Sequence, residues 1–414
     1  MGTRQSGRAS IKRSGTLLLL LLFFTIAVPG CRERTVSPQG SAAVSQAPGG
    51  GPVPATLRGD PTLNLLFARI AGLPGPPGVA AGWQAESSWK SYAELAGKDW
   101  RDFDATVLEP MRVWASRELR ETRRATGAVF YAFGGPDFVT SDILFPEAAE
   151  TVLIGLEPAG NLPELDRAAA WREAFFADFG ELISGFLKRG YFITHEMNDI
   201  YSRGKVDGAL PVIAFFLERG GYAVADVRRL APNAAGDWIE TPYERLAVRP
   251  HRPYGVKIVY LKPGEESPRT VYYFSCDVEN KAFPPGSPLY RFLSRLDRMT
   301  TFVKSGSYLL HWNDFSTVRR FILDRSLFVL EDDTAVPYRF FKNAGWQIRL
   351  FGRYATPVED FTNVEQPDLR KAYEGGSTVV EPLPFHFGYR WKTQIDNLLL
   401  AKRPRRPYKV PAVH

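Results

Sequence analysis

The chain has 414 residues, a net charge of +7, 44% hydrophobic residues and 13% aromatic residues. Residues 1–30 hold four basic side chains and no acidic one, which leaves a net charge of +3 for the rest of the chain. This modest charge, with no stripe of Lys and Arg interleaved with aromatics, gives no support to nucleic-acid binding. The hydrophobic content is sufficient for a large packed core.

The amino-terminal segment has the layout of a secretory signal. Basic residues between Arg4 and Arg13 precede an apolar run over 16–28, and Gly30 stands immediately before Cys31. The run has about 13 residues, whereas a membrane-spanning helix, the alternative interpretation, needs roughly 20. A cysteine in this position resembles a bacterial lipoprotein signal peptide. The resemblance implies cleavage after residue 30, acylation of the Cys31 thiol and, because Arg32 follows, export to the outer membrane facing the periplasm.

The composition of the next segment predicts a tether. Residues 31–59 are rich in Gly, Pro, Ser and Ala and have no apolar periodicity. We expect a folded unit over 60–400 and a basic tail over 401–414, either solvated or in contact with anionic lipid or polymer. With Cys31 acylated, Cys276 has no cysteine partner, so an intrachain disulfide and cysteine-based zinc sites are excluded. We expect the Cys276 thiol to be buried.

Asp60 and Pro61 predict the start of a helix that runs to about residue 71, because Asp caps helices and Pro suits the first helical position. Apolar spacing predicts further helices over 87–124, 163–189, 211–219, 288–299 and 316–325. Strands are predicted over 128–133, 151–156, 191–194, 256–261, 269–278, 307–311, 327–330 and 347–354.

These elements predict an α/β or α+β fold, in which a mixed sheet is covered by helices and the amino-terminal region is helical. The stretch 232–254 is predicted to be irregular and is a possible internal boundary within one large unit.

Acidic residues follow several of the predicted strands. Asp137, Glu157 and Asp277 with Glu279 stand after such runs, and Asp332 follows another. Ligands of open α/β sheets gather beyond the carboxyl ends of the strands, so these carboxylates are candidates for a common cleft. Paired carboxylates supply a general acid and a general base. The alternative is that each one caps a turn or a helix.

Other patterns argue against cofactors. His195 and Glu196, with Asp199, lack the second histidine of a metal-binding helix, so we predict no metal site there. Ser275 and Cys276 lack the glycines of a nucleophile elbow. The chain has no G-x-G-x-x-G or P-loop pattern, and we predict no nucleotide cofactor.

Aromatic residues alternate near the carboxyl end. Phe385, Phe387, Tyr389 and Trp391 predict a strand with one aromatic face. Such a face packs in a core or, alternatively, forms a platform on which sugar rings stack. Tyr389 and Trp391 are therefore candidate binding residues.

Four segments, FYAFGGPDF, LIGLEPAG, YYFSCDVEN and LPFHFGYRW, together resemble an uncharacterised family of bacterial exported proteins over most of residues 60–395. The resemblance implies a single folded unit and transfers no catalytic residue.

Two functional hypotheses follow. The first is a lipid-anchored binding or assembly module of the cell envelope, acting on polysaccharide, peptidoglycan or protein partners. The second is a carboxylate-based hydrolase of envelope glycan, with Asp277 and Glu157 as the working pair and Asp137 as a further candidate. Carboxylates about 5–10 Å apart across a cleft would favour the hydrolase.

Overall fold

The structure is a computed structural model that describes residues 58–75, 82–247, 253–361, 363–375, 379–391, 393 and 395–404. The signal peptide, Cys31, most of the predicted tether and the tail from residue 405 lie outside these residues. The chain divides into the units Met1–Pro52 and Val53–His414, and every described residue belongs to the second. Among the described residues, no helix combines the length and the apolar composition needed to cross a membrane.

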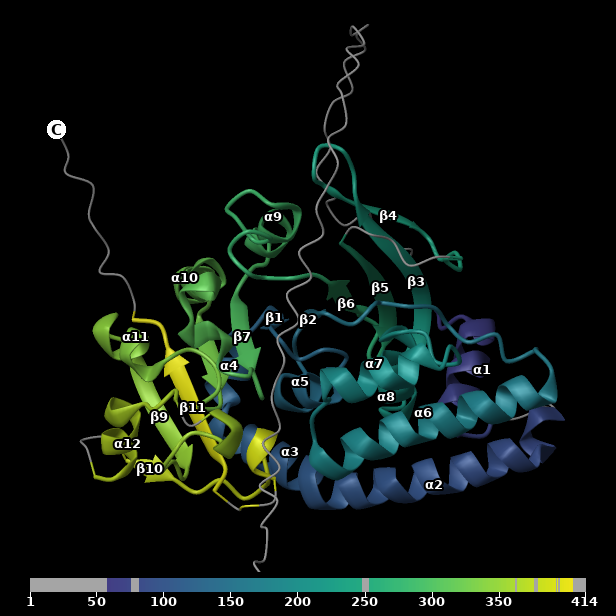
Figure 1. The fold of residues 1–414 in the computed structure, drawn as a ribbon, viewed down its shortest axis with the longest axis horizontal. Helices are drawn as coiled ribbons and strands as arrows, with labels where there is room; N and C mark the ends of the chain where they lie inside the picture. Colours follow the sequence, from purple (N-terminus) through teal and green to yellow (C-terminus); the bar gives the residue numbers. More distant parts are fainter. Residues whose placement is uncertain are drawn as a thin grey trace, which may run out of the picture. The chain divides into compact units, whose positions relative to one another are not determined.

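In the described part of the chain, the strands form one 11-stranded sheet in the order β10-β9-β11-β8-β7-β1-β2-β6-β5-β3-β4 (Figure 1). The strands are β1 (Ala128–Tyr131), β2 (Glu150–Gly155), β3 (Ala223–Pro232), β4 (Trp238–Pro242), β5 (Tyr254–Leu261), β6 (Arg269–Ser275), β7 (Met299–Val303), β8 (Phe328–Glu331), β9 (Gln347–Gly352), β10 (Val380–Glu381) and β11 (Asn397–Lys402).

The five central strands β8, β7, β1, β2 and β6 run parallel. Strands β5, β3 and β4 extend one side as antiparallel neighbours, and β11 joins β8 to β9 in antiparallel fashion on the other. Every residue of β1, β7 and β8 is buried. Central parallel strands are covered on both faces, which is why they are rich in apolar residues in the sequence.

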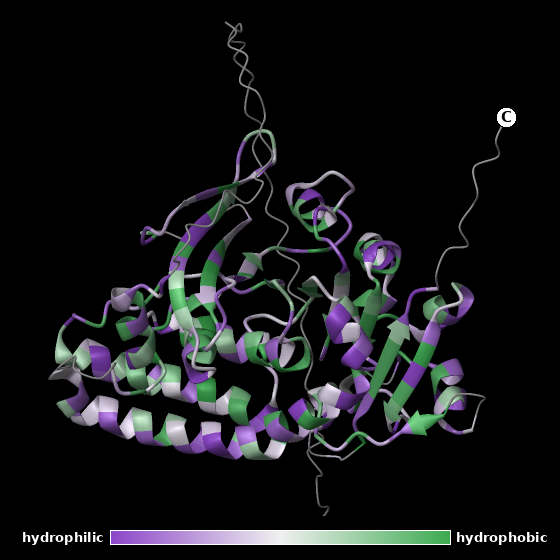
Figure 2. Cartoon of the chain, turned by 180° about the vertical axis from the view of Figure 1, so that it is seen from behind, coloured by the Kyte–Doolittle hydropathy of each residue, from purple (hydrophilic) through white to green (hydrophobic). Residues whose placement is uncertain are grey.

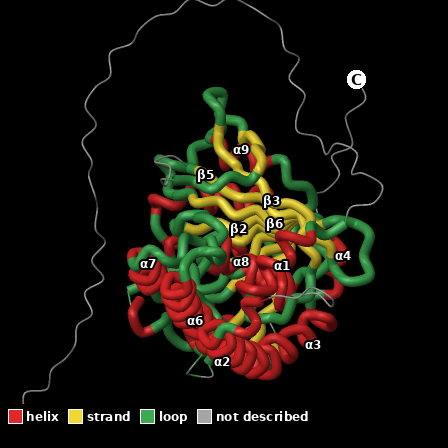
Figure 3. Tube along the Cα trace, turned by 90° about the vertical axis from the view of Figure 1, so that its right-hand side faces the viewer, coloured by secondary structure: helices red, strands yellow, loops and turns green. Residues whose placement is uncertain are grey.

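The helices cover both faces of the sheet. They are α1 (Pro61–Ile70), α2 (Ser87–Phe103), α3 (Glu109–Glu118), α4 (Arg120–Ala125), α5 (Phe138–Leu144), α6 (Ala169–Arg189), α7 (Thr194–Ser202), α8 (Leu210–Arg219), α9 (Pro288–Ser294), α10 (Ser316–Arg325), α11 (Tyr338–Asn343) and α12 (Pro367–Tyr373). Helices α1 to α8 pack on the first face and α9 to α12 on the second, each with its own hydrophobic cluster. Figure 3 shows α2, α6 and α8 on one side of the strands and α9 on the other. Figure 2 shows the apolar residues concentrated in the strands, while the helices alternate in hydropathy.

After the two central strands β1 and β7, the chain continues to opposite faces of the sheet. From β1 it passes through α5, on the first face, to β2; from β7 it passes through α10, on the second face, to β8. The carboxyl ends of β1 and β7, which pair directly, therefore flank a topological switch point. In open α/β sheets this is the usual place for a ligand.

The predicted α/β class with a mixed sheet is confirmed, as is the first helix, whose cap Asp60 accepts from the backbone N–H of Thr62 at 2.8 Å. Three predicted strands are wrong. Residues 191–194 lead into α7, 307–311 form a turn and a 3₁₀ helix, and 385–391 include the 3₁₀ helix Gly388–Arg390. Ser307 and Tyr308 have φ angles of 51° and 55°, which a strand does not accommodate. The stretch 232–254, predicted to be irregular, contains β4 and the start of β5.

The predicted basic tail begins inside the last strand. Lys402 ends β11 and pairs with Glu121 at 2.5 Å, and Arg403 donates to the carbonyl oxygens of Leu323 and Asp324. These two basic side chains therefore fasten the end of the sheet to neighbouring helices.

Two glycines, Gly160 and Gly208, lie where the segment after β2 crosses the segment before α8 with backbone contact. Asn161 N–H donates to Asp207 O at 2.9 Å, and Ala209 N–H donates to Pro158 O at 2.9 Å. Gly160 has a φ of 70°, and a Cβ there would overlap the carbonyl group of Asp207. Only glycine meets both conditions.

We predict that Gly160→Ala lowers the free energy of unfolding by roughly 3 kcal/mol or more, because backbone strain and steric overlap add. Gly204→Ala is the matched control, since Gly204 has a φ of 75° and open space around it. It should cost only about 1–2 kcal/mol for the left-handed conformation. Urea unfolding measures both, and equal losses would show that the crossing does not require glycine.

Candidate functional site

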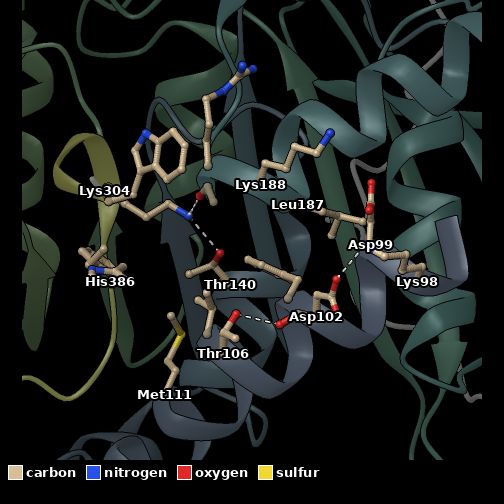
Figure 4. A pocket seen from close by; sticks show the side chains of 17 residues that line it. Lys98, Asp99, Asp102, Thr106, Met111, Thr140, Leu187, Lys188, Lys304 and His386 are labelled. Atoms are coloured by element: carbon tan, nitrogen blue, oxygen red, sulfur yellow. Dashed lines mark hydrogen bonds and ion pairs between the residues drawn. The ribbon is translucent and has the colours of Figure 1, made fainter. Parts of the chain in front are cut away.

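A cavity of about 290 Å³ lies on the first face, beside the switch point (Figure 4). Its walls come from α2, the start of α3, α5, the end of α6, the residues after β7, and the segment 386–391. Between α2 and α3 the chain makes a π-helical turn, Asp104–Leu108, and Thr106 and Val107 of this turn line the cavity. Such turns are rare and frequently occur at functional sites.

Lys304, the first residue after β7, forms the base of the cavity. Its Nζ donates to Asp137 Oδ2 at 2.5 Å, to Thr140 Oγ1 at 2.9 Å and to Gly190 O at 2.6 Å. The side chains of Lys304 and Asp137 are only 4% and 1% exposed. Tyr131 also donates to Asp137 Oδ2, at 2.9 Å, and burial followed by the Asp137 charge holds the Tyr131 pKa well above its usual value. The ammonium group thus joins the ends of β1 and β7 to α5 and α6.

A histidine–aspartate pair stands in the same wall of the cavity as Lys304 (Figure 4). His386 lines the cavity, and its Nδ1 lies 3.0 Å from Asp396 Oδ2. Asp396 Oδ1 accepts from the Phe387 backbone N–H at 2.6 Å, and burial raises the pKa of this carboxyl group. The carboxylate orients the imidazole ring, a relationship also found in acid–base sites.

Asp332 and Asp333, which follow β8, hold the segment that ends at Trp391. Asp332 Oδ2 accepts from the Ser305 N–H at 2.8 Å, and a Cβ at Gly388 would lie only 2.6 Å from this oxygen. Burial, followed by the charge of Asp333, raises the pKa of Asp332 to about 6. Asp333 accepts from Arg390 Nη2 at 3.1 Å and from Asn397 Nδ2 at 2.7 Å. Its bonds fasten the cavity wall to β11.

Backbone strain concentrates at the switch point. Five non-glycine residues in the described part of the chain have positive φ, and four of them follow β1 or β7. They are Phe133 at 62°, Ser305 at 56°, Ser307 at 51° and Tyr308 at 55°. Such conformations cost free energy and cluster at ligand sites, where the surrounding structure enforces them.

The structure brings together three of the predicted site residues. Trp391 lines the cavity, Tyr389 donates to Ser305 O at 2.9 Å, and Asp332 binds the N–H of the same Ser305. Asp137 lies beneath them, bound to Lys304.

The other predicted residues lie away from this cavity. Glu157 is buried, and its carbonyl oxygen accepts from Tyr273 Oη at 2.8 Å. Asp277 is exposed and accepts from the Glu279 N–H at 2.8 Å, while Glu279 pairs with Lys281 at 2.7 Å. Glu157 and Asp277 follow the neighbouring strands β2 and β6, but neither lines the cavity.

Cys276 is buried, and burial raises the pKa of its thiol to about 12, which disfavours the thiolate. His195, Glu196 and Asp199 lie in or around α7, where Glu196 pairs with Arg189 at 2.5 Å. Within the described ranges, no group of three or more His, Cys, Asp or Glu side chains is arranged to hold a metal ion.

Sequence reasoning missed Asp99, Lys304 and the pairing of His386 with Asp396. Lys304 follows β7, which was not predicted from the sequence: only Met299 lay in a predicted element, the end of the helix 288–299. Two threonines, Thr300 and Thr301, interrupt the apolar pattern of this strand, so no strong local signal precedes the lysine. The histidine and aspartate are ten positions apart in irregular backbone, and no local pattern joins them.

Comparison with family models, curated proteins and solved structures finds no match for this chain. The functional interpretation therefore rests on the geometry of the site.

We predict that Lys304→Met lowers the free energy of unfolding by about 3–5 kcal/mol, because it leaves the buried Asp137 carboxylate without its cation. Adding Asp137→Asn should restore part of this loss, since the second change removes the uncompensated charge. Denaturant unfolding of the two single variants and the double variant gives the coupling energy. Additive losses would contradict a buried ion pair at this position.

Proposed function

We propose that this protein is a lipid-anchored component of the bacterial cell envelope whose folded unit binds a unit of envelope polysaccharide or peptidoglycan. The cavity beside the switch point carries the proposal. Its volume, about 290 Å³, stands at the lower end of the range for ligand pockets, roughly 300–1,000 Å³. It therefore suits a small molecule or one repeating unit of a polymer.

The lining supports an envelope ligand. Phe103, Phe387 and Trp391 supply apolar and aromatic surface, and Asp99 and Lys188 are among the polar groups at the walls. An apolar lining with a few convergent polar groups is typical of small-molecule sites. The geometry supports binding more directly than catalysis, because no Ser or Cys among the described residues lines the cavity as a nucleophile.

The anchor is part of the proposal and rests on the sequence before Cys31. We predict that the protein expressed in a bacterium sediments with membranes and carries acyl chains on Cys31. Cys31→Ser should abolish the acyl mass shift and release the protein from washed membranes, because the hydroxyl group does not replace the acylated thiol. Intact-mass spectrometry and fractionation measure both. Unchanged membrane attachment of the variant would contradict a lipid anchor.

Blocking the cavity should abolish binding. Val107 lines it, whereas Val113, which is 47% exposed on α3, does not. We predict that full-length protein in detergent binds soluble peptidoglycan or polysaccharide fragments, that Val107→Trp weakens the binding at least tenfold, and that Val113→Trp leaves it unchanged. Isothermal titration calorimetry measures the affinities. Equal binding by both variants would place the ligand elsewhere.

A second candidate function is hydrolysis of envelope glycan by Glu157 and Asp277. Their positions after neighbouring strands favour it, since Cys276 N–H donates to Gly155 O at 3.1 Å and the strand ends lie together. The same fragments, analysed by mass spectrometry after incubation, separate the two functions. Cleavage products that disappear with Asp277→Asn would establish the hydrolase, whereas binding without cleavage supports the binding module.

A further inference from the structure

Most charged side chains around the cavity have an ionic partner. Lys98 pairs with Asp102 at 3.1 Å, Lys304 with Asp137 at 2.5 Å, Arg189 with Glu196 at 2.5 Å, and His386 with Asp396 at 3.0 Å. Two charges of opposite sign remain. Within the described ranges, Asp99 and Lys188 line the cavity and form no ion pair, either with each other or with another residue.

Asp99 is a buried carboxylate that pairs with no cation in the described part of the chain. It lies on α2, is 8% exposed, and accepts a hydrogen bond from Ser184 Oγ of α6 at 2.6 Å. Removing a carboxylate from water is costly unless a positive charge or several hydrogen bonds compensate. The hydroxyl group fixes the orientation of the carboxylate and brings no positive charge. A cationic group of a ligand in this cavity would supply the missing partner.

Lys188 supplies the complementary charge. It is exposed and lies one helical turn after Ser184 on α6, so the two unpaired charges line the cavity from packed neighbouring helices. Figure 4 shows Asp99 and Asp102 on one side of the cavity and Lys304 and His386 on the other. Phe103, Met111 and Leu187 contribute apolar surface to the same walls.

From this arrangement we infer that the ligand is an amino-acid zwitterion, with its ammonium group on Asp99 and its carboxylate on Lys188. This inference rests on the proposed binding function and specifies the ligand. The apolar side chains contact the carbon skeleton between the two charges. A free amino acid has this chemistry, and so does a peptidoglycan stem peptide whose diamino acid keeps an unlinked amine and carboxylate.

The site is preorganised for such a ligand. Helices α2 and α6 pack along their length, with stacked rings of Tyr92 and Phe176 5.1 Å apart and the Ser184–Asp99 hydrogen bond further along. Because packing fixes both helices, a ligand gains the Asp99 interaction without ordering the carboxylate first.

Calorimetry on the full-length protein in detergent tests the inference with three probes. The first is a muramyl peptide that ends in a diamino acid with free ammonium and carboxylate groups. The second is the same peptide with that amine acetylated, and the third is free 2,6-diaminopimelic acid. The free-amine peptide should bind at least tenfold more tightly than the acetylated one.

Variants locate the interaction. Asp99→Asn should remove the preference for the free amine, since the amide still accepts from Ser184 but carries no charge. Lys188→Gln, at an exposed position, should weaken binding of the free-amine peptide several-fold. Asp104→Asn is the control, and its effect should stay within about threefold because Asp104 is paired with Arg112 at 3.0 Å and does not line the cavity. Thermal unfolding verifies that each variant is folded.

The outcomes separate this inference from the proposed function. If the acetylated peptide binds equally well, or Asp99→Asn keeps the preference, while Val107→Trp still abolishes binding, the zwitterion assignment is overturned and the binding function stands. If free diaminopimelic acid binds as tightly as the peptide, the zwitterion assignment stands and a polymer ligand is overturned. If none of the three probes binds, the zwitterion assignment is overturned, and the binding function is overturned with it when soluble polysaccharide fragments also fail to bind.

Discussion

The buried ion pair between Lys304 and Asp137 is the constraint on which the site depends. Lys304 follows β7 and Asp137 follows β1, so the pair joins the two strands whose connections leave toward opposite faces of the sheet. Taking both charges out of water costs free energy, which the short contact offsets together with the bonds from Lys304 to Thr140 and Gly190. The same bonds tie the amino-terminal end of α5 and the carboxyl end of α6 to the sheet. The cavity lies where these ends meet.

Three carboxylates then support the segment 386–391 of the cavity wall, which has little regular secondary structure. Asp333 accepts from Arg390 and Asp396 from the Phe387 N–H, both within this segment. Asp332 accepts from the N–H of Ser305, whose carbonyl oxygen accepts from Tyr389 Oη. Acidic residues at strand ends were predicted to form a catalytic cleft or to cap turns. In the structure, the bonds of these three residues hold a loop in place. The wall is therefore fixed tightly enough to keep Trp391 at the cavity.

The sequence allowed four of the five central strands, β1, β2, β6 and β8, and most helices to be predicted, because these buried strands are rich in apolar residues and the covering helices have an apolar stripe. It did not reveal β7, where Thr300 and Thr301 interrupt the apolar pattern, or β4, where four of five residues are exposed and the apolar signal is lost. Strands β3, β10 and β11 were not predicted either. The alternation from Phe385 to Trp391 was assigned to a strand because strands have a period of two. This assignment is wrong because a loop whose aromatic side chains meet a core produces the same period. Within residues 307–311, the positive φ angles of Ser307 and Tyr308 prevent a strand despite the apolar pattern. Neither residue type predicts a positive φ angle. The site could be predicted in part: Asp332, Tyr389 and Trp391 were identified from local patterns, whereas the contacts of Lys304 and His386 depend on residues distant in the chain.

Asp99 differs from the other acidic residues of the site in its position in the chain. This difference explains why sequence patterns identify residues that hold the cavity wall in place more readily than residues that would contact a ligand. Asp137 and Asp333 follow strands and pair with Lys304 and Arg390, so their charges are compensated within the protein. Asp332, which also follows a strand, accepts from the backbone N–H groups of Ser305 and Thr334. Asp99 lies inside a helix, where the backbone N–H groups are already bonded to carbonyl groups of the preceding turn, and its partner Ser184 comes from another helix. A carboxylate in that position finds few hydrogen-bond donors in its own helix. In the proposed complex, the ammonium group of the ligand supplies the opposite charge at the cavity wall.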